Sequence, residues 1–214
     1  MCQTAALHAQ QPTALLLTSA SSRTSMGAAF SAKFHKLPLE VIGLTSETNA
    51  AYVRSLGTYD RVCLYADVAS LPGQKVAVFD VAGDATTLQS VYEHFGDCVV
   101  HCSRVGITHV ASAGQQPKLY GLGGVPPVPF IVFTAMEDVG KAYGTKESAK
   151  MLAEASRAFR TAMMPSFRAE RAFGAEATLE AFEKMARGEA RPEVTYICSL
   201  WPREKHEPTL HSRL

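Results

Sequence analysis

Short apolar runs alternate with amphipathic stretches through the first half of the chain. The runs that predict buried strands cover residues 14–18, 39–44, 61–65, 75–81 and 97–102. Between them, apolar residues recur every three or four positions, as on one face of a helix, over residues 24–33, 47–56 and 84–95. This alternation is typical of a parallel sheet with helices on both faces.

The second half of the chain has a different pattern. Residues 106–128 are rich in Gly, Pro, Ser and Gln and predict a long loop, and residues 130–134 predict a further strand. Apolar stripes predict helices over residues 149–163 and around 179–185, and strands are expected at 165–172 and 194–200. We therefore expect an α/β fold: a Rossmann-like, doubly wound parallel sheet of about six strands with a small C-terminal appendage.

This pattern also predicts a division of the chain. We expect an N-terminal tail at residues 1–12, a dinucleotide-binding domain at 13–164, a return segment at 165–201 and a disordered tail at 202–214.

Composition excludes several classes of protein. The net charge of +1 offers no basic surface for nucleic acid or membrane, and no apolar run reaches the roughly 18–20 residues of a membrane span. The N-terminus lacks a signal-peptide pattern, so a cytoplasmic protein is expected. The five cysteines are scattered, and Cys98 and Cys102 read as small core residues rather than metal ligands, so no metal site is expected.

The turn after the first predicted strand carries the candidate chemistry. Residues 19–25, Ser-Ala-Ser-Ser-Arg-Thr-Ser, lead into a helix, and a helix N-terminus attracts phosphate through its unpaired N–H groups and partial positive charge. The hydroxyls of Ser21, Ser22 and Thr24 can donate to phosphate oxygens, and Arg23 can pair with one. The usual G-x-G-x-x-G fingerprint is absent, since Gly27 is the first glycine. The alternative is that these serines only cap the helix.

The end of the second strand points to the type of dinucleotide. NAD-binding sheets carry an acid there for the ribose 2′-hydroxyl, whereas Thr45 and Ser46 stand at this end, followed by Glu47. Hydroxyls suit a 2′-phosphate better than a carboxylate does, so NADP(H) is the expected cofactor. The catalytic residues stay unknown. The predicted cofactor-binding residues are Ser19, Ser21, Ser22, Arg23, Thr24, Thr45, Ser46, Asn49 and Val81.

Three segments together resemble the cofactor domain of the medium-chain dehydrogenase/reductase superfamily, especially its quinone-oxidoreductase-like members. They are residues 15–33 (LLLTSASSRTSMGAAFSAK), 41–65 (VIGLTSETNAAYVRSLGTYDRVCLY) and 75–84 (KVAVFDVAGD). The turn and the LTSETN segment look closer still to an uncharacterised branch of unknown function. Residues 165–200 are similar to the superfamily's C-terminal return, and the resemblance covers about residues 13–201.

This resemblance implies a zinc-independent NADP(H) oxidoreductase that transfers hydride to an unknown carbonyl or enone-type substrate. Members of the superfamily carry an N-terminal GroES-like barrel, whereas only about a dozen residues precede the first strand here. A fragment and a natural short form are both compatible with this. The alternative is a non-catalytic nucleotide-binding or scaffold protein. Apolar surface that a barrel would cover predicts self-association.

Overall fold

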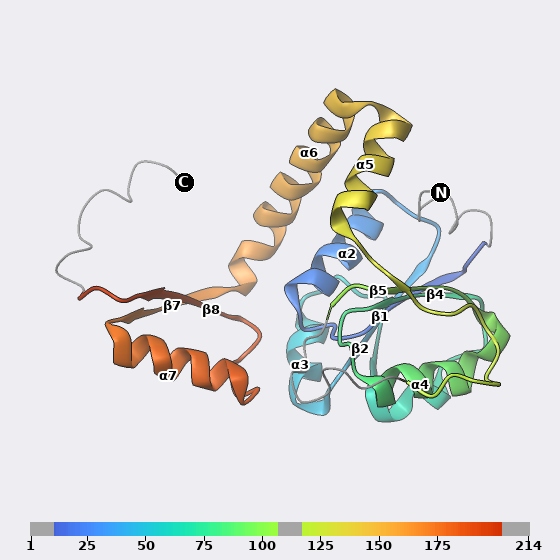
Figure 1. Cartoon of the computed structure of the whole chain (residues 1–214), viewed down its shortest axis with the longest axis horizontal. Helices are drawn as coiled ribbons and strands as arrows, with labels where there is room; N and C mark the ends of the chain where they lie inside the picture. The colour runs from blue at the N-terminus through green and yellow to red at the C-terminus, as the bar shows by residue number, and fades with distance from the viewer. Residues whose placement is uncertain (1–10, 107–116, 203–214) are drawn as a thin grey trace. The chain divides into compact units, whose positions relative to one another are not determined.

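The computed structural model describes residues 11–106 and 117–202 of the chain. The described residues divide after Met164 into two compact units, one ending at Met164 and the other beginning at Pro165 (Figure 1).

The first unit contains a six-stranded parallel sheet in the order β3-β2-β1-β4-β5-β6. Its strands are β1 (Ala14–Leu17), β2 (Glu40–Thr45), β3 (Arg61–Leu64), β4 (Val76–Asp80), β5 (Val99–Arg104) and β6 (Val128–Pro129). The central strand β1 sets Leu16 beside Ile42 of β2 and Val78 of β4. Such continuous apolar runs are required where a strand is buried on both faces.

Helices cover both faces of this sheet. They are α2 (Arg23–Phe34), α3 (Glu47–Ser55) and α4 (Ala85–Phe95), with short 3₁₀ turns η1 (Tyr65–Ser70) and η2 (Gly96–Cys98). One apolar cluster joins Leu16 and Val78 to Leu88 and Tyr92 of α4. The other joins Leu17 to Ala29 of α2 and Val53 of α3. The predicted doubly wound fold is therefore confirmed.

The strand predicted at residues 130–134 is wrong. Only Val128–Pro129 pairs with β5, and a helical hairpin follows, formed by α5 (Val132–Tyr143) and α6 (Thr145–Met163). The β-branched Ile131 and Val132 favour a strand locally, but apolar residues at 132, 135, 136, 139 and 143 repeat with a helical period. The rings of Phe159 on α6 and Phe30 on α2 meet edge to face at 5.6 Å.

The second unit is a single β-α-β element. Strands β7 (Arg168–Phe173) and β8 (Val194–Ser199) pair in parallel, and α7 (Ala175–Ala186) connects them. The turn η4 (Met164–Ser166) spans the division between the units. Ala181 and Val194 are buried in this unit, whereas Leu179, Phe182 and Trp201 are each more than half exposed.

Candidate functional site

The strand order reverses between β1 and β4, which are neighbours in the middle of the sheet. From β1 the chain passes through α2 to β2 on one side, and from β4 it passes through α4 to β5 on the other. In open α/β sheets, ligands bind in the crevice outside the strand ends at this position. The turn after β1 lies there, which places the predicted site residues of this turn at the sheet's switch point.

Hydrogen bonds to three other segments fix the backbone of this turn. Ser19 is buried and has a positive φ of 51°, and its N–H donates to the hydroxyl of Tyr65 at 3.1 Å. The N–H of Ala20 donates to the carbonyl of Leu44 at 2.9 Å, and its carbonyl accepts the hydroxyl of Tyr59 at 2.8 Å. A positive φ is costly for any residue except glycine, so these contacts must hold Ser19 in place.

The N-terminus of α2 follows directly. Ser22 is the N-cap, and its hydroxyl accepts the N–H of Ser25 at 3.2 Å, so the capping alternative holds for this serine. Arg23 and Thr24 are exposed in the first helical turn, which contains no acidic residue. The helix dipole and the nearby guanidinium therefore both favour an anion at this end.

The corner between β2 and α3 contacts the same turn. Asn49, in the first turn of α3, donates through Nδ2 to the Ser21 hydroxyl at 3.2 Å. Thr45 is buried at the end of β2, and Ser46 is the half-buried N-cap residue of α3. The structure thus brings Ser21 and Asn49 together, although they are 28 residues apart in the sequence.

A buried polar network occupies the end of β4. The hydroxyl of Thr18 donates to Asp80 Oδ1 at 2.9 Å and accepts the N–H groups of Val81 and Ala82 at 2.8 and 2.9 Å. Asp80 also accepts the N–H of Gly83, and its Oδ2 lies 3.6 Å from Nε of Arg104. Val81 is buried, and it takes part in this network through its backbone N–H, which donates to the Thr18 hydroxyl.

Electrostatics make Asp80 a structural group. It is 1% exposed, and burial raises the pKa of its carboxyl, while the Gly83 N–H, the Thr18 hydroxyl and Arg104 act to lower it. Oδ1 accepts the hydrogen bonds from Thr18 and Gly83, whereas buried Oδ2 accepts no hydrogen bond from the described residues and is balanced by the ion pair with Arg104. The hydrogen bond from Thr18 to Oδ1 joins the end of β1 to β4 beneath the switch point.

Thr18 and Tyr65 are site residues that the sequence reasoning missed. A hydroxyl at the end of a buried strand was the available signal for Thr18. Tyr65 has no comparable local signal, because its contact with Ser19 joins residues 46 positions apart.

Three further features of the described residues concern metal binding, thiol reactivity and membrane insertion. Within residues 11–106 and 117–202, no group of three or more His, Cys, Asp or Glu side chains is placed to hold a metal ion. Burial raises the pKa of the Cys102 thiol to about 12, so this residue packs as an uncharged core side chain. No helix in the described part of the chain is both long and apolar enough to cross a membrane.

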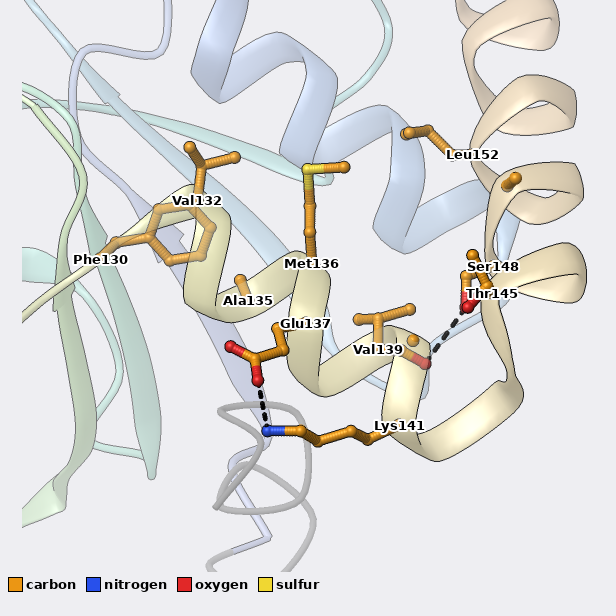
Figure 2. Close-up of a pocket in the computed structure, with 12 residues that line it drawn as sticks. Phe130, Val132, Ala135, Met136, Glu137, Val139, Lys141, Thr145, Ser148 and Leu152 are labelled. Atoms are coloured by element: carbon orange, nitrogen blue, oxygen red, sulfur yellow. Dashed lines mark hydrogen bonds and ion pairs between the residues drawn. The ribbon is translucent and has the colours of Figure 1, made fainter.

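A groove of about 710 Å³ lies along the α5–α6 hairpin (Figure 2), and none of the predicted site residues lines it. Its walls are mainly apolar, including Met136, Val139 and Leu152, and the Glu137–Lys141 ion pair lies among the lining residues.

A family model described as a protein of unknown function, DUF2855, matches residues 3–191. None of the curated proteins matches the sequence significantly. Among solved structures, the chain is similar to YhdH from E. coli K-12 with bound NADPH, at 19% identity and a TM-score of 0.58, covering 93% of this chain and 59% of that one.

Two further structures give the same picture. The yhdH oxidoreductase from Salmonella enterica, in complex with NADP, is 18% identical with a TM-score of 0.56, over 91% of this chain and 58% of that one. CurA from Vibrio vulnificus, in complex with NADPH, is 15% identical with a TM-score of 0.56, over 92% of this chain and 60% of that one. At these identities the likeness establishes the fold, and the chain spans less than two thirds of each of these proteins.

Proposed function

This chain belongs to the DUF2855 family of proteins of unknown function, and we propose that it is the NADP(H)-binding part of a zinc-independent, medium-chain oxidoreductase-like protein. The observation that carries the proposal is the hydroxyl-rich turn at the N-terminus of α2, lying at the switch point of the sheet. Similar folds with bound NADPH or NADP support it.

The residues of the turn divide into two groups under this proposal. The pyrophosphate lies over Ser21, Arg23 and Thr24, near the positive end of the helix, while Ser19 and Ser22 shape the backbone around it. The 2′-phosphate lies at the β2–α3 corner near Thr45, Ser46 and Asn49, and Val81 borders the cofactor from the end of β4.

The bound cofactor would supply hydride chemistry, and the chain's own residues would bind and orient it. The substrate is of the carbonyl or enone type, and a barrel domain would complete the cleft. The engagement of Asp80 with Thr18, Gly83 and Arg104 supports a second candidate, a non-catalytic nucleotide-binding or scaffold protein, because this carboxyl then serves structure rather than proton transfer. NADPH oxidation in the presence of quinone and enone acceptors distinguishes the two candidates.

Replacing Arg23 by alanine is expected to weaken NADPH binding about tenfold, because a charge-assisted contact contributes roughly 1.5–3 kcal/mol. Calorimetric titration of the wild type and Arg23→Ala with NADPH and NADH measures this. Arg61→Ala is the matched control, since Arg61 lies at the amino end of β3, opposite to the strand ends that form the candidate site, and pairs with Glu40. Equal affinity of the wild type for both dinucleotides would contradict the 2′-phosphate assignment, and binding of neither would contradict the function.

We also propose that the chain self-associates through exposed apolar side chains. On α5, Phe133 is 81% exposed and Met136 is 57% exposed. Met136 also lines the groove (Figure 2). Sedimentation velocity over a range of concentrations should show association in the wild type and a monomer in Met136→Glu. Thr86→Glu, which places the same charge on exposed α4 surface, is the control. A wild type that stays monomeric at every concentration refutes this proposal.

A further inference from the structure

Two tyrosines hold the turn after β1, and they do so with opposite polarity. Tyr59 donates its hydroxyl proton to the carbonyl of Ala20 at 2.8 Å. Tyr65 instead accepts, because the N–H of Ser19 donates to its hydroxyl oxygen at 3.1 Å. A phenol that accepts a hydrogen bond still carries one proton of its own to donate.

The backbone N–H of Ser19 is therefore already engaged. In a glycine-rich fingerprint the turn brings its backbone close to the pyrophosphate. Here the first residue of the turn is a serine with a φ of 51°, and its N–H points to a phenol. Because the phenol accepts the Ser19 N–H, a ligand at the turn would not receive a hydrogen bond from this amide.

Tyr65 is well placed to act as a fixed donor. It is the first residue of η1, directly after β3, and its ring packs against the apolar cluster on the α4 side of the sheet. Burial raises the pKa of its hydroxyl, and the charges of Asp84 and Asp80 act in the same direction, while hydrogen bonds from Ser19 act against them. The phenol is consequently protonated at neutral pH.

Resting on the proposed function, we propose that the Tyr65 hydroxyl donates a hydrogen bond to the pyrophosphate of the bound dinucleotide, in place of the direct amide contact that Ser19 would make. The N–H of Ser19 then polarises the phenol, and the chain from amide to phenol to phosphate oxygen strengthens each bond. Tyr65 is in this way a cofactor-binding residue supplied from beyond the edge strand β3.

Calorimetric titration with three probes tests this assignment. ADP-ribose carries the pyrophosphate without the 2′-phosphate, adenosine 2′-monophosphate carries the reverse, and NADPH carries both. In Tyr65→Phe, the affinities for ADP-ribose and NADPH are expected to fall about tenfold, as for a lost hydrogen bond to a charged group. The affinity for adenosine 2′-monophosphate is expected to stay unchanged.

Tyr59→Phe is the matched control, because it removes a hydrogen bond to the same turn but no donor to the ligand. It should weaken ADP-ribose binding clearly less than Tyr65→Phe does, and an equal loss would show that Tyr65 only supports the turn. Unchanged ADP-ribose affinity in Tyr65→Phe, or a loss confined to probes with a 2′-phosphate, overturns the assignment alone. A wild type that binds neither ADP-ribose nor NADPH overturns the proposed function as well.

Discussion

Replacing Arg104 by glutamine is expected to destabilise the chain by about 2–3 kcal/mol near neutral pH, because it leaves the buried Asp80 carboxylate without its cationic neighbour. The Arg104 Nε lies 3.6 Å from Asp80 Oδ2, and Asp80 is 1% exposed. Thr18 and Gly83 still donate hydrogen bonds to Oδ1 in this variant, so the destabilisation comes from Oδ2, which loses its ion pair. Denaturant unfolding of the two proteins measures the difference.

The penalty should depend on pH in a defined direction. Burial already raises the pKa of Asp80, so the folded chain binds this proton more tightly than the unfolded chain. A contribution of this sign is present in acid and is lost as the pH rises through the pKa of the folded carboxyl. Removing Arg104 raises this pKa further, so the cost of Arg104→Gln should be small while the carboxyl is protonated and should grow as it ionises.

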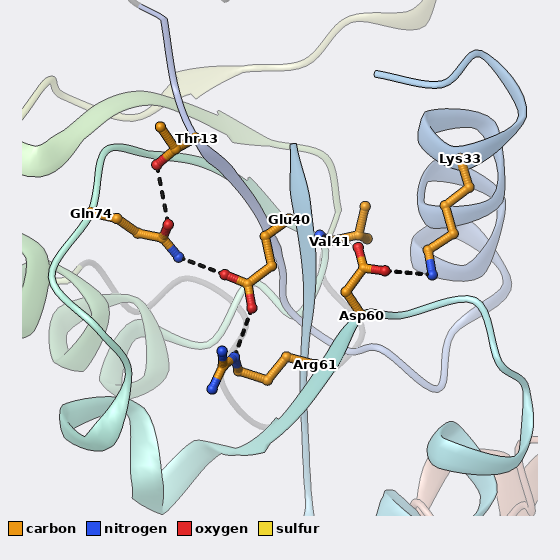
Figure 3. A network of polar contacts seen from close by, with 7 residues as sticks. All are labelled: Thr13, Lys33, Glu40, Val41, Asp60, Arg61 and Gln74. Carbon is orange, nitrogen blue, oxygen red and sulfur yellow. Dashed lines mark hydrogen bonds and ion pairs between the residues drawn. The ribbon is translucent and has the colours of Figure 1, made fainter. Parts of the chain in front are cut away.

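An ion pair at the opposite end of the sheet provides the control. Arg61 binds Glu40 at 2.8 Å, and Gln74 also donates to this carboxylate (Figure 3). The hydrogen bond from Gln74, followed by that from Arg61, lowers the pKa of Glu40. Arg61→Gln should therefore cost less than about 1 kcal/mol, as for an exposed pair. The destabilisation by Arg61→Gln should reach its full value at a lower pH than the destabilisation by Arg104→Gln, because the pKa of Glu40 is lowered whereas the pKa of Asp80 is raised. The same size and pH profile in both variants would contradict a special role for the Asp80 network.

The sheet could be predicted because its signal is local. Strands buried on both faces require short continuous apolar runs, and the runs at residues 14–18 and 75–81 differ little from β1 and β4. The segment at 130–134 misled the prediction because its β-branched residues favour a strand, whereas the helical period becomes visible only when Met136 and Val139 are included. Helix formation there depends on a partner helix, α6, that the short segment does not reveal.

The candidate site could be predicted only in part, for the same reason. A run of small hydroxyl residues before a helix marks an anion-attracting turn from its own sequence, whatever the rest of the chain does. What fixes that turn comes from afar: Asp80 meets Thr18 across 62 residues, and Tyr65 meets Ser19 across 46. Those contacts follow from the strand order, which places the ends of β1, β3 and β4 along one edge.

The close packing beneath the turn also has no local signal, and Gly43 is its most sensitive point. This residue lies in β2, where an added Cβ would stand 2.7 Å from Cδ1 of Tyr59 and 2.9 Å from Cβ of Ala20. Neither neighbour is free to move easily, because Tyr59 is buried and bonded to the carbonyl of Ala20, whose own side chain is fully buried.

Gly43→Ala is therefore expected to destabilise the chain by about 1–3 kcal/mol through overpacking, and to weaken NADPH binding by displacing Ala20 within the turn. Gly27→Ala provides a control of opposite sign. Gly27 lies inside α2, and apart from its chain neighbours and the helix's own backbone no atom of the described residues lies within 4 Å of an added Cβ. Alanine should therefore stabilise the helix by about 0.5–1 kcal/mol. Denaturant unfolding and calorimetric titration of both variants measure these effects. If Gly43→Ala kept both the stability and the NADPH affinity of the wild type, β2 would not shape the turn through this contact.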